Sequence, residues 1–556
     1  MLKMPGAVFR AGCVCLPLGL TIQAKAEVPA LGPTACAALD VAIPADAIGL
    51  RSGRAVIDSA AYSPATPLAI AERAATPASR ISPPSPDFCK ILGHIEPLDP
   101  QAPPIRFEVN LPAAWNGRSV QYGGGGFNGV LTTGLGLVPA GRFDQPSPLA
   151  RGYVTVGTDS GHQAAPGQPP QAFALNDEAF RNFSHESYKK VRDVAVAVMR
   201  RAYGTGPEKA YFFGSSEGGR EALTMAQRYP DDFDGIFARV PVINWTGLQH
   251  AGTRGGLATM GEAWVRPAHV KLVANAVLAA CDAVDGIVGD APGCRTKFDP
   301  LRLACPAGHS GDDCLDQAQI AAIDTLHSPY RFSFPLANGV TEYPGWGVSG
   351  EAIPASGPTG GWSAWWLGAS PPAEPPKPDN GIQWSFGSGA IRYVFARDPT
   401  LDVARYRPED HAARVREVSA LMDSTDPDLS RFMAHGGKLI MLEHMSDYAQ
   451  SPYAGIGYFA SVEARLGKDQ VRGFARLYTA PGVDHVGSGA PANVDILAAL
   501  SDWVERGKAP QDLTLVEQRV EPGFPVMRAR PLCEWPQWPH YEGGDVAQAA
   551  SFACGP

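Results

Sequence analysis

Apolar positions along the first part of the chain alternate between helical and strand-like spacing. A stripe with intervals of three and four residues marks residues 186–203 as an amphipathic helix. Its apolar members are Val191, Val194, Ala195, Val198, Met199 and Ala202. Shorter apolar or alternating runs at 106–111, 119–122 and 153–157 predict strands before this helix. Alternating strands and helices are typical of a mostly parallel α/β sheet.

This rhythm stops near Val242 and returns at residues 438–442 and 474–478, which have the pattern of buried strands. An amphipathic helix is predicted near residues 493–505. The segment between holds seven of the eleven tryptophans and four cysteines, and it shows no α/β rhythm. We therefore expect a first core part (27–242), an inserted lid domain (243–428) and a second core part (429–556).

The first 26 residues have the pattern of an export signal. Lys3 and Arg10 precede an apolar run over residues 11–22, and Ala-Lys-Ala at 24–26 matches a cleavage site. No later stretch holds 18 consecutive apolar residues, so the sequence predicts no membrane span. A signal peptide at 1–26 predicts a secreted or periplasmic protein. The net charge of −9 offers no basic surface for nucleic acid.

Cysteine usage agrees with export, because an even number remains after cleavage of the signal. The eight cysteines are Cys36, Cys89, Cys281, Cys294, Cys305, Cys314, Cys533 and Cys554. Their spacing favours three local pairs, which leaves Cys36 to pair with Cys89. The local pairs are Cys281–Cys294, Cys305–Cys314 and Cys533–Cys554. None has C-x-x-C spacing, which argues against zinc.

The segment Gly-Ser-Ser-Glu-Gly at 214–218 fits the pattern G-x-S-x-G. An aromatic run, Tyr-Phe-Phe at 211–213, precedes it, and a helix-compatible run at 219–229 follows. A serine on a tight strand-to-helix turn is the arrangement of a nucleophile elbow. The sequence thus predicts Ser216 as a nucleophile.

A nucleophilic serine needs a base, and the base needs a carboxylate to orient it. His485 follows the strand predicted at 474–478, and Asp447 follows the strand predicted at 438–442. The order Ser, Asp, His along the chain matches the order in hydrolases with such an elbow. Two alternatives remain open here: Asp484 as the carboxylate and His444 as the base.

Acyl transfer also needs hydrogen-bond donors for the oxyanion. The backbone N–H after the nucleophile belongs to Glu217, and it is one expected donor. The glycine-rich run at 123–129 is expected to supply the second, from Gly124, because its backbone can approach a developing charge closely. The absence of the pattern G-x-x-x-x-G-K-[ST] argues against a phosphate-binding loop.

Together these motifs resemble the tannase and feruloyl esterase family. The resemblance runs through segments 123–129, 151–153, 158–162, 214–220, 228–235, 281–283, 314–317 and 437–439, and through Pro481-Gly482 before His485. It implies an α/β fold, namely an α/β-hydrolase core with a large inserted lid domain. It also implies hydrolysis of aromatic carboxylic esters through an acyl-enzyme, with no cofactor for catalysis.

The chain departs from the family pattern beside the predicted nucleophile. The family usually carries a disulfide between the residue before the serine and the residue after the histidine. Here these positions hold Ser215 and Val486, so both cysteines are absent together. A disulfide typically contributes about 2–4 kcal/mol. We expect packing and hydrogen bonds to hold Ser216 and His485 together instead.

The resemblance also raises the question of calcium. The family lid often holds this ion in an Asp-rich loop, and the matching segment here, 281–294, is shorter by about four residues. Asp282, Asp285 and Asp290, with the carbonyl of Ile287, are the predicted ligands of a structural calcium ion. The alternative is a disulfide-closed loop without metal.

The predicted substrate is a small aromatic ester. Tryptophan and tyrosine side chains of the lid suit a flat acyl group, although most of them belong in the lid core on either view. Arg392 and Arg397 are candidate ligands of a substrate carboxylate or phenol, with structural salt bridges as the alternative. Two other functions stay open: hydrolysis of aliphatic or polyester oligomers, and a non-catalytic secreted binding protein.

Overall fold

The computed structural model describes residues 1–2, 30–74, 76–282, 287, 294, 297–352 and 361–556. Its central feature is a nine-stranded sheet with the order β1-β4-β5-β7-β6-β8-β9-β12-β13. The strands from β7 to β13 run parallel, and the β1-β4, β4-β5 and β5-β7 pairs are antiparallel. In this order the strands are β1 (Ala55–Ser63), β4 (Phe88–Ile95), β5 (Ile105–Pro112), β7 (Val154–Thr158), β6 (Arg118–Tyr122), β8 (Lys209–Ser215), β9 (Gly235–Arg239), β12 (Lys438–His444) and β13 (Ala475–Ala480).

Helices cover both faces of this sheet, as the alternation of buried side chains along β8 shows. Tyr211 and Phe213 pack in one core cluster with α14 (Ile496–Arg506). Phe212 points to the opposite face and packs in another cluster with α4 (Glu217–Arg228). Further helices on the sheet are α3 (Ser187–Tyr203), α12 (Pro452–Leu466) and α13 (Lys468–Phe474). This arrangement confirms the predicted α/β-hydrolase type of fold.

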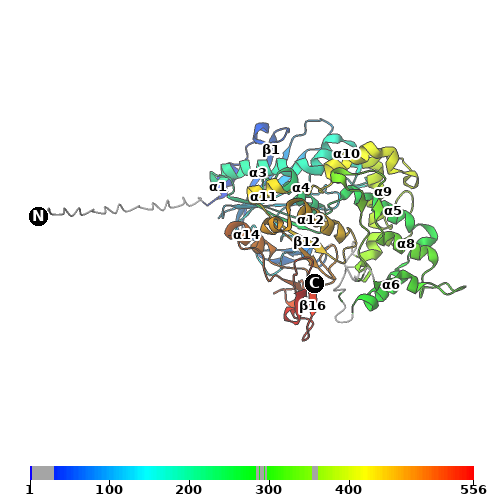
Figure 1. Cartoon of the computed structure of the whole chain (residues 1–556). Coiled ribbons are helices and arrows are strands. Elements are labelled where there is room, and N and C mark those ends of the chain that lie inside the picture. The colour runs from blue at the N-terminus through cyan, green and yellow to red at the C-terminus, as the bar shows by residue number, and fades with distance from the viewer. Residues whose placement is uncertain (3–29, 75, 283–286, 288–293, 295–296, 353–360) are drawn as a thin grey trace.

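A mainly helical segment connects β9 to β12, and in Figure 1 its helices gather beside the sheet. This is the part of the chain where the lid was predicted. Five fully buried tryptophans lie in its core: Trp245, Trp346, Trp362, Trp366 and Trp384. Its helices are α5 (Trp245–Ala258), α6 (Pro267–Cys281), α8 (Gln317–His327), α9 (Ile382–Ala390) and α10 (Ala412–Met422), with α11 (Ser430–His435) leading into β12.

Four disulfides join the predicted pairs. They are Cys36–Cys89, Cys281–Cys294, Cys305–Cys314 and Cys533–Cys554. The first fastens the N-terminal helix α1 (Pro33–Ala37) to β4, the second strand of the sheet. The last closes a region of two small hairpins, built from β14 (Thr514–Gln518), β15 (Val526–Pro531), β16 (Trp538–Tyr541) and β17 (Phe552–Gly555).

The N-terminal signal predicted at 1–26 falls almost wholly on residues 3–29, outside the described residues. Within the described ranges, no helix has the length and apolar character needed to cross a membrane.

Candidate active site

Ser216 lies on the sharp turn between β8 and α4. Its backbone has φ 62° and ψ −123°, a conformation that costs energy for a residue with a side chain. The glycines of the motif are needed for space. A Cβ on Gly214 would lie 1.8 Å from the Gly218 carbonyl oxygen, and one on Gly218 would lie 2.7 Å from the Gly124 carbonyl oxygen. The local structure is therefore the predicted nucleophile elbow.

The structure brings Ser216, His485 and Asp447 together. His485 Nδ1–H donates to Asp447 Oδ2 at 2.7 Å, which leaves Nε2 as an acceptor for the Ser216 hydroxyl at 2.9 Å. Asp447 is buried, and its Oδ1 accepts the backbone N–H groups of Ala449 and Gln450. The carboxylate is thus fixed before it orients the imidazole.

Neither alternative partner has this geometry. His444 is fully buried, and its Nδ1–H donates to the Asp484 carbonyl at 2.6 Å. Burial lowers the pKa of His444 well below its usual range, so the ring is neutral. Asp484 Oδ1 accepts the N–H groups of Val486 and Ser488. Both residues shape the loop that carries His485.

The structure corrects the predicted role of Gly124. Its N–H donates to Glu221 Oε2 at 2.9 Å and lies 3.1 Å from the Tyr188 hydroxyl, so it is engaged within the protein. Glu221 Oε1 also accepts from Asn128 Nδ2 at 2.7 Å, which ties the glycine-rich loop to α4. Glu221 offers buried carboxyl oxygens as acceptors, and the sequence alone did not reveal that they lie beside Gly124. Glu217 is the first residue of α4, and among the described residues its backbone N–H donates no hydrogen bond.

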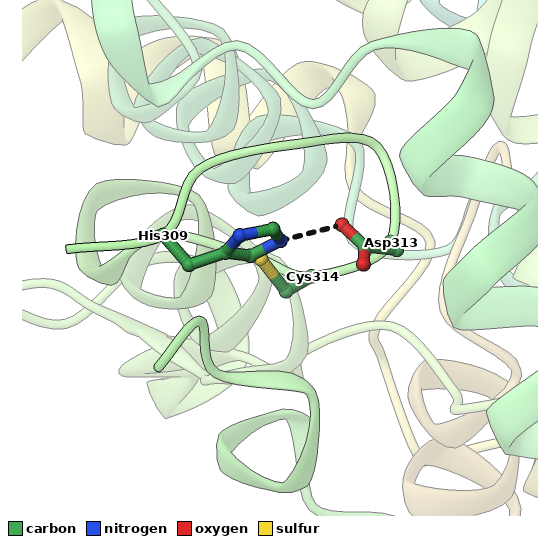
Figure 2. Close-up of side chains that lie close together, drawn as sticks. All are labelled: His309, Asp313 and Cys314. Carbon is green, nitrogen blue, oxygen red and sulfur yellow. Dashed lines mark hydrogen bonds and ion pairs between the residues drawn. The ribbon is translucent and has the colours of Figure 1, made fainter. Parts of the chain in front are cut away.

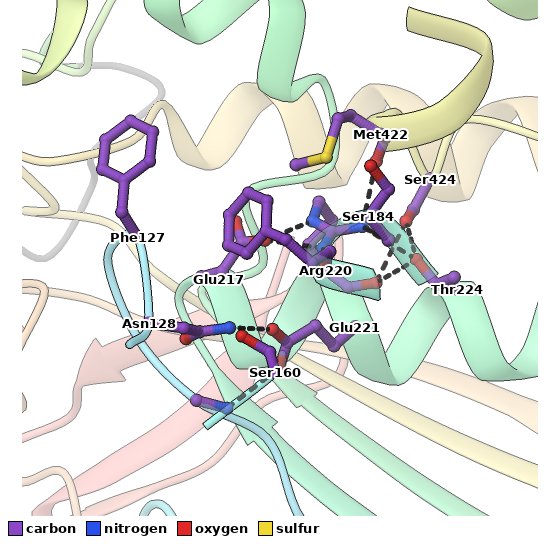
Figure 3. A network of polar contacts seen from close by, with 12 residues as sticks. Phe127, Asn128, Ser160, Ser184, Glu217, Arg220, Glu221, Thr224, Met422 and Ser424 are labelled. Carbon is purple, nitrogen blue, oxygen red and sulfur yellow. Dashed lines mark hydrogen bonds and ion pairs between the residues drawn. The ribbon is translucent and has the colours of Figure 1, made fainter. Parts of the chain in front are cut away.

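Figure 3 shows the buried ionic network below the elbow. The Arg220 guanidinium is fully buried and donates to Glu217 Oε1 at 2.7 Å. It also donates to the carbonyl groups of Ser184, Phe183 and Met422. Burial, reinforced by the charge of Glu217, raises the pKa of Glu221 to about 8. The network joins the elbow helix to the end of α10.

A cavity of about 830 Å³ lies beside the nucleophile, and Ser215, Ser216 and His485 line it. Its walls come mainly from residues 63–66, 76–90 and 133–143. Arg239, at the end of β9, also lines this cavity and was missed in the sequence analysis. The available signal was its position at the carboxyl end of a parallel strand, where ligands bind in α/β sheets.

The two arginines predicted to bind substrate are used elsewhere, which corrects that prediction. Arg392 forms an ion pair with Glu374 and donates to the Leu401 carbonyl. Arg397 pairs with Asp177. Neither arginine lines the cavity at Ser216. Both arginines therefore form structural salt bridges, which was the alternative prediction: Arg392 with Glu374 and Arg397 with Asp177.

Aromatic side chains lie on another side of His485. The Trp365 ring is 6.1 Å from the imidazole, and the Tyr448 ring is 6.2 Å from it, between ring centroids. Phe386 meets Trp365 edge to face at 5.8 Å. The helical segment and the loop after β12 thus supply an aromatic wall next to the base.

The predicted calcium ligands are only partly within the described residues. Asp285 and Asp290 lie outside them, Asp282 is the residue after α6, and the Ile287 side chain is buried in the core. Among described residues, one cluster has metal-ligand types at short range: His309, Asp313 and Cys314 (Figure 2). The Cys314 sulfur is bonded to Cys305, so this cluster offers no thiolate. Calcium stays a prediction.

Comparisons with known proteins agree with this geometry. The family model described as tannase and feruloyl esterase matches residues 89–555. An uncharacterized esterase of Agrobacterium fabrum is 38% identical over 489 residues, covering 84% of this chain and 85% of that protein. A mono(2-hydroxyethyl) terephthalate hydrolase of Piscinibacter sakaiensis is 32% identical over 541 residues, covering 87% of each.

Solved structures show the same fold. The crystal structure of feruloyl esterase B from Aspergillus oryzae matches with a TM-score of 0.74 and 24% identity, over 94% of this chain and 100% of that one. Tannin acyl hydrolase from Aspergillus niger matches with a TM-score of 0.69 and 19% identity, over 96% of both chains. At these identities the likeness concerns the fold alone.

Proposed function

Because the chain belongs to the tannase and feruloyl esterase family and is therefore a carboxylic ester hydrolase, we propose that it is a secreted serine esterase acting on small aromatic esters. Ser216 is the nucleophile, His485 the general base and Asp447 the residue that orients the base. The observation that carries this assignment is the continuous hydrogen-bond chain from the Ser216 hydroxyl through His485 to Asp447.

The reaction follows from that chain of contacts. His485 Nε2 takes the Ser216 proton as the serine oxygen attacks the ester carbonyl, and Glu217 N–H donates to the oxygen that becomes negative. His485 then gives the proton to the leaving alcohol. Water, deprotonated by the same imidazole, attacks the acyl-enzyme and releases the acid.

The aromatic substrate class has two supports. The partly exposed Trp365 ring lies beside His485, and the partly exposed Phe386 ring packs against Trp365, so these two rings are candidates for stacking with a flat acyl or alcohol group. A mono(2-hydroxyethyl) terephthalate hydrolase and a probable feruloyl esterase are among the relatives, at 32% and 29% identity. The alternative function, hydrolysis of aliphatic or polyester oligomers, would use the same catalytic residues Ser216, His485 and Asp447.

An ester panel with active-site labelling tests the proposal. Wild-type protein should hydrolyse methyl ferulate, methyl gallate or a terephthalate monoester faster than aliphatic oligoesters of equal length. A fluorophosphonate probe should label Ser216, and Ser216→Ala should lose both labelling and turnover. Ser215→Ala is the matched control, because it removes the neighbouring hydroxyl and should still be labelled. Turnover by Ser216→Ala would refute the assignment of the nucleophile.

We also propose that the protein is secreted and that it binds one structural calcium ion. The four disulfides support an oxidising destination, and N-terminal sequencing of secreted protein should begin at Glu27. The Cys281–Cys294 disulfide closes the segment that carries the predicted calcium ligands. Elemental analysis of the purified protein should find one calcium per chain if the ligand set holds the ion.

A further inference from the structure

The cavity at Ser216 has a wall with a marked charge imbalance. Arg239 and Lys90 contribute to this wall, and among the described residues no aspartate or glutamate does. Lys90 lies 3.7 Å from Glu108, which partly neutralises it behind the wall. A concave, partly apolar site lined by cations concentrates anions. The guanidinium of Arg239 is thus the main charge in the cavity.

Pairing between neighbouring strands places Arg239 beside the nucleophile. Arg239 on β9 is in register with Ser215 on β8, and its carbonyl accepts the Ser216 N–H at 3.0 Å. Its Nε–H donates to Ser215 Oγ at 2.8 Å. On the other side, a Cβ on Gly487 would lie 3.4 Å from a terminal guanidinium nitrogen. The side chain therefore sits between the serine turn and the loop of His485.

The guanidinium group of Arg239 is charged, and its terminal nitrogens are available to bind a ligand. Burial lowers its pKa to about 10, so it still carries a proton at neutral pH. Among described residues the hydrogen bond of the Arg239 guanidinium comes from Nε, and no ion pair of its two terminal nitrogens is found. The nearby carboxylates of Asp447 and Asp484 already accept hydrogen bonds from His485 and from backbone N–H groups. Two parallel N–H donors facing a cavity match a carboxylate.

We propose that Arg239 is a specificity-determining residue that selects esters carrying a free carboxylate. The carboxylate binds the terminal nitrogens of Arg239, and the carbon body of the substrate lies along Leu135, Val138 and Phe143 in the same cavity. The positions that hold Ser215 and Val486 in place of the family's cysteines are both in this wall, so the cavity includes the space beside them. The inference rests on the proposed esterase function and names its substrate class.

Two matched ester pairs test the inference and locate the carboxylate. Monoethyl terephthalate and ethyl p-toluate differ by a carboxylate on the acyl side, and p-acetoxybenzoate and p-tolyl acetate differ by one on the alcohol side. The measured quantity is the ratio of kcat/KM for the charged ester to that for the neutral ester. In at least one pair, Arg239→Met should lower this ratio about tenfold or more, mainly through KM, as expected for a lost charge-assisted bidentate contact. Arg239→Lys should keep part of the preference.

Arg142→Met is the matched control, because Arg142 pairs with Asp144 and does not line the cavity. It removes one positive charge from the segment 133–143, part of which lines the cavity, and should change the ratio by less than about twofold. Since Arg239→Met also loses the bond to Ser215, circular dichroism and labelling of Ser216 report whether the elbow is intact. If Arg239→Met does not fold, Arg239→Gln serves as the neutral variant.

A binding measurement separates the two proposals. Calorimetry with terephthalate and Ser216→Ala protein requires no turnover, and binding should weaken about tenfold or more when Arg239→Met is added. An unchanged ratio in both ester pairs, or unchanged terephthalate binding, overturns the role of Arg239 while hydrolysis of neutral esters still supports the esterase. Absence of hydrolysis and of labelling in wild-type protein overturns the proposed function itself.

Discussion

Replacing Arg220 by methionine tests how the buried network supports the elbow. Arg220 is fully buried, and the variant Arg220→Met removes the cation that faces Glu217. The two carboxyl groups of Glu217 and Glu221 then remain inside the protein without their positive partner. Carbonyl groups of Ser184 and Met422 also lose a donor.

The expected loss of stability follows from these contacts. Removing one member of a buried ion pair costs about 3–5 kcal/mol, because the remaining charge is desolvated without compensation. With a urea m value of about 3 kcal/mol/M or more for a protein of this size, the midpoint should fall by about 1 M. Adding Glu217→Gln to Arg220→Met removes the stranded charge and should restore at least half of the loss.

The pH dependence has a definite sign. Burial raises the pKa of Glu217 in the folded protein, and without Arg220, which opposes this shift, the pKa rises further. A carboxyl with a raised folded pKa adds stability below its unfolded pKa, and that stability is lost as pH rises through the folded value. Arg220→Met should therefore lose less stability at pH about 5 than at pH about 8, measured by urea unfolding.

Arg506→Met is the control for removing an arginine. Arg506 is exposed and pairs with Asp502 one helical turn away, so its loss should cost less than about 1 kcal/mol. If Arg220→Met shifts the midpoint no more than Arg506→Met does, or if its loss is equal at both pH values, the reasoning about the buried charges is wrong.

Three further predictions concern the site and its surroundings. Asp447→Asn should lower kcat by about three to four orders of magnitude with a nearly unchanged KM, since the imidazole loses its orienting acceptor. Paired Cys36→Ser and Cys89→Ser should lower the free energy of unfolding by about 2–5 kcal/mol, because the disulfide spans 53 residues. Glu221 has a folded pKa of about 8, so wild-type stability should fall as pH rises from 5 towards 8, and Glu221→Gln should flatten that slope in urea titrations.

Patterns along the chain predicted the features that depend on local sequence. The strand before Ser216 and the helix after it follow from apolar spacing, and the order of Ser216, Asp447 and His485 follows from the positions of predicted strands. The strands β1, at the edge of the sheet, and β4, next to it, were not predicted, because their partly exposed positions give a weaker apolar signal.

Features that depend on long-range pairing were missed or misassigned. Arg239 becomes part of the site because β9 lies next to β8, a pairing that the apolar pattern around residues 235–239 does not reveal on its own. The sequence did not show that Arg397 forms an ion pair with Asp177, because Asp177 lies 220 residues earlier in the chain. Arg397 was therefore kept as a candidate for substrate binding. The assignment of Gly124 to the oxyanion was wrong because its N–H donates to the buried Glu221, which belongs to another element of the fold. In each case a distant side chain determined the role.

The loop of His485 shows how the site holds its geometry without the disulfide that its family usually has. Asp484 Oδ1 accepts two backbone N–H groups of the loop, and its carbonyl accepts from His444 at 2.6 Å. On the other side of the missing bridge, the Ser215 hydroxyl accepts from Arg239. At about 1 kcal/mol each, these contacts together match the contribution of about 2–4 kcal/mol from a disulfide. Arg239, which donates to Ser215, is also the side chain that we propose to bind a substrate carboxylate, so this position bears on that proposal as well as on stability.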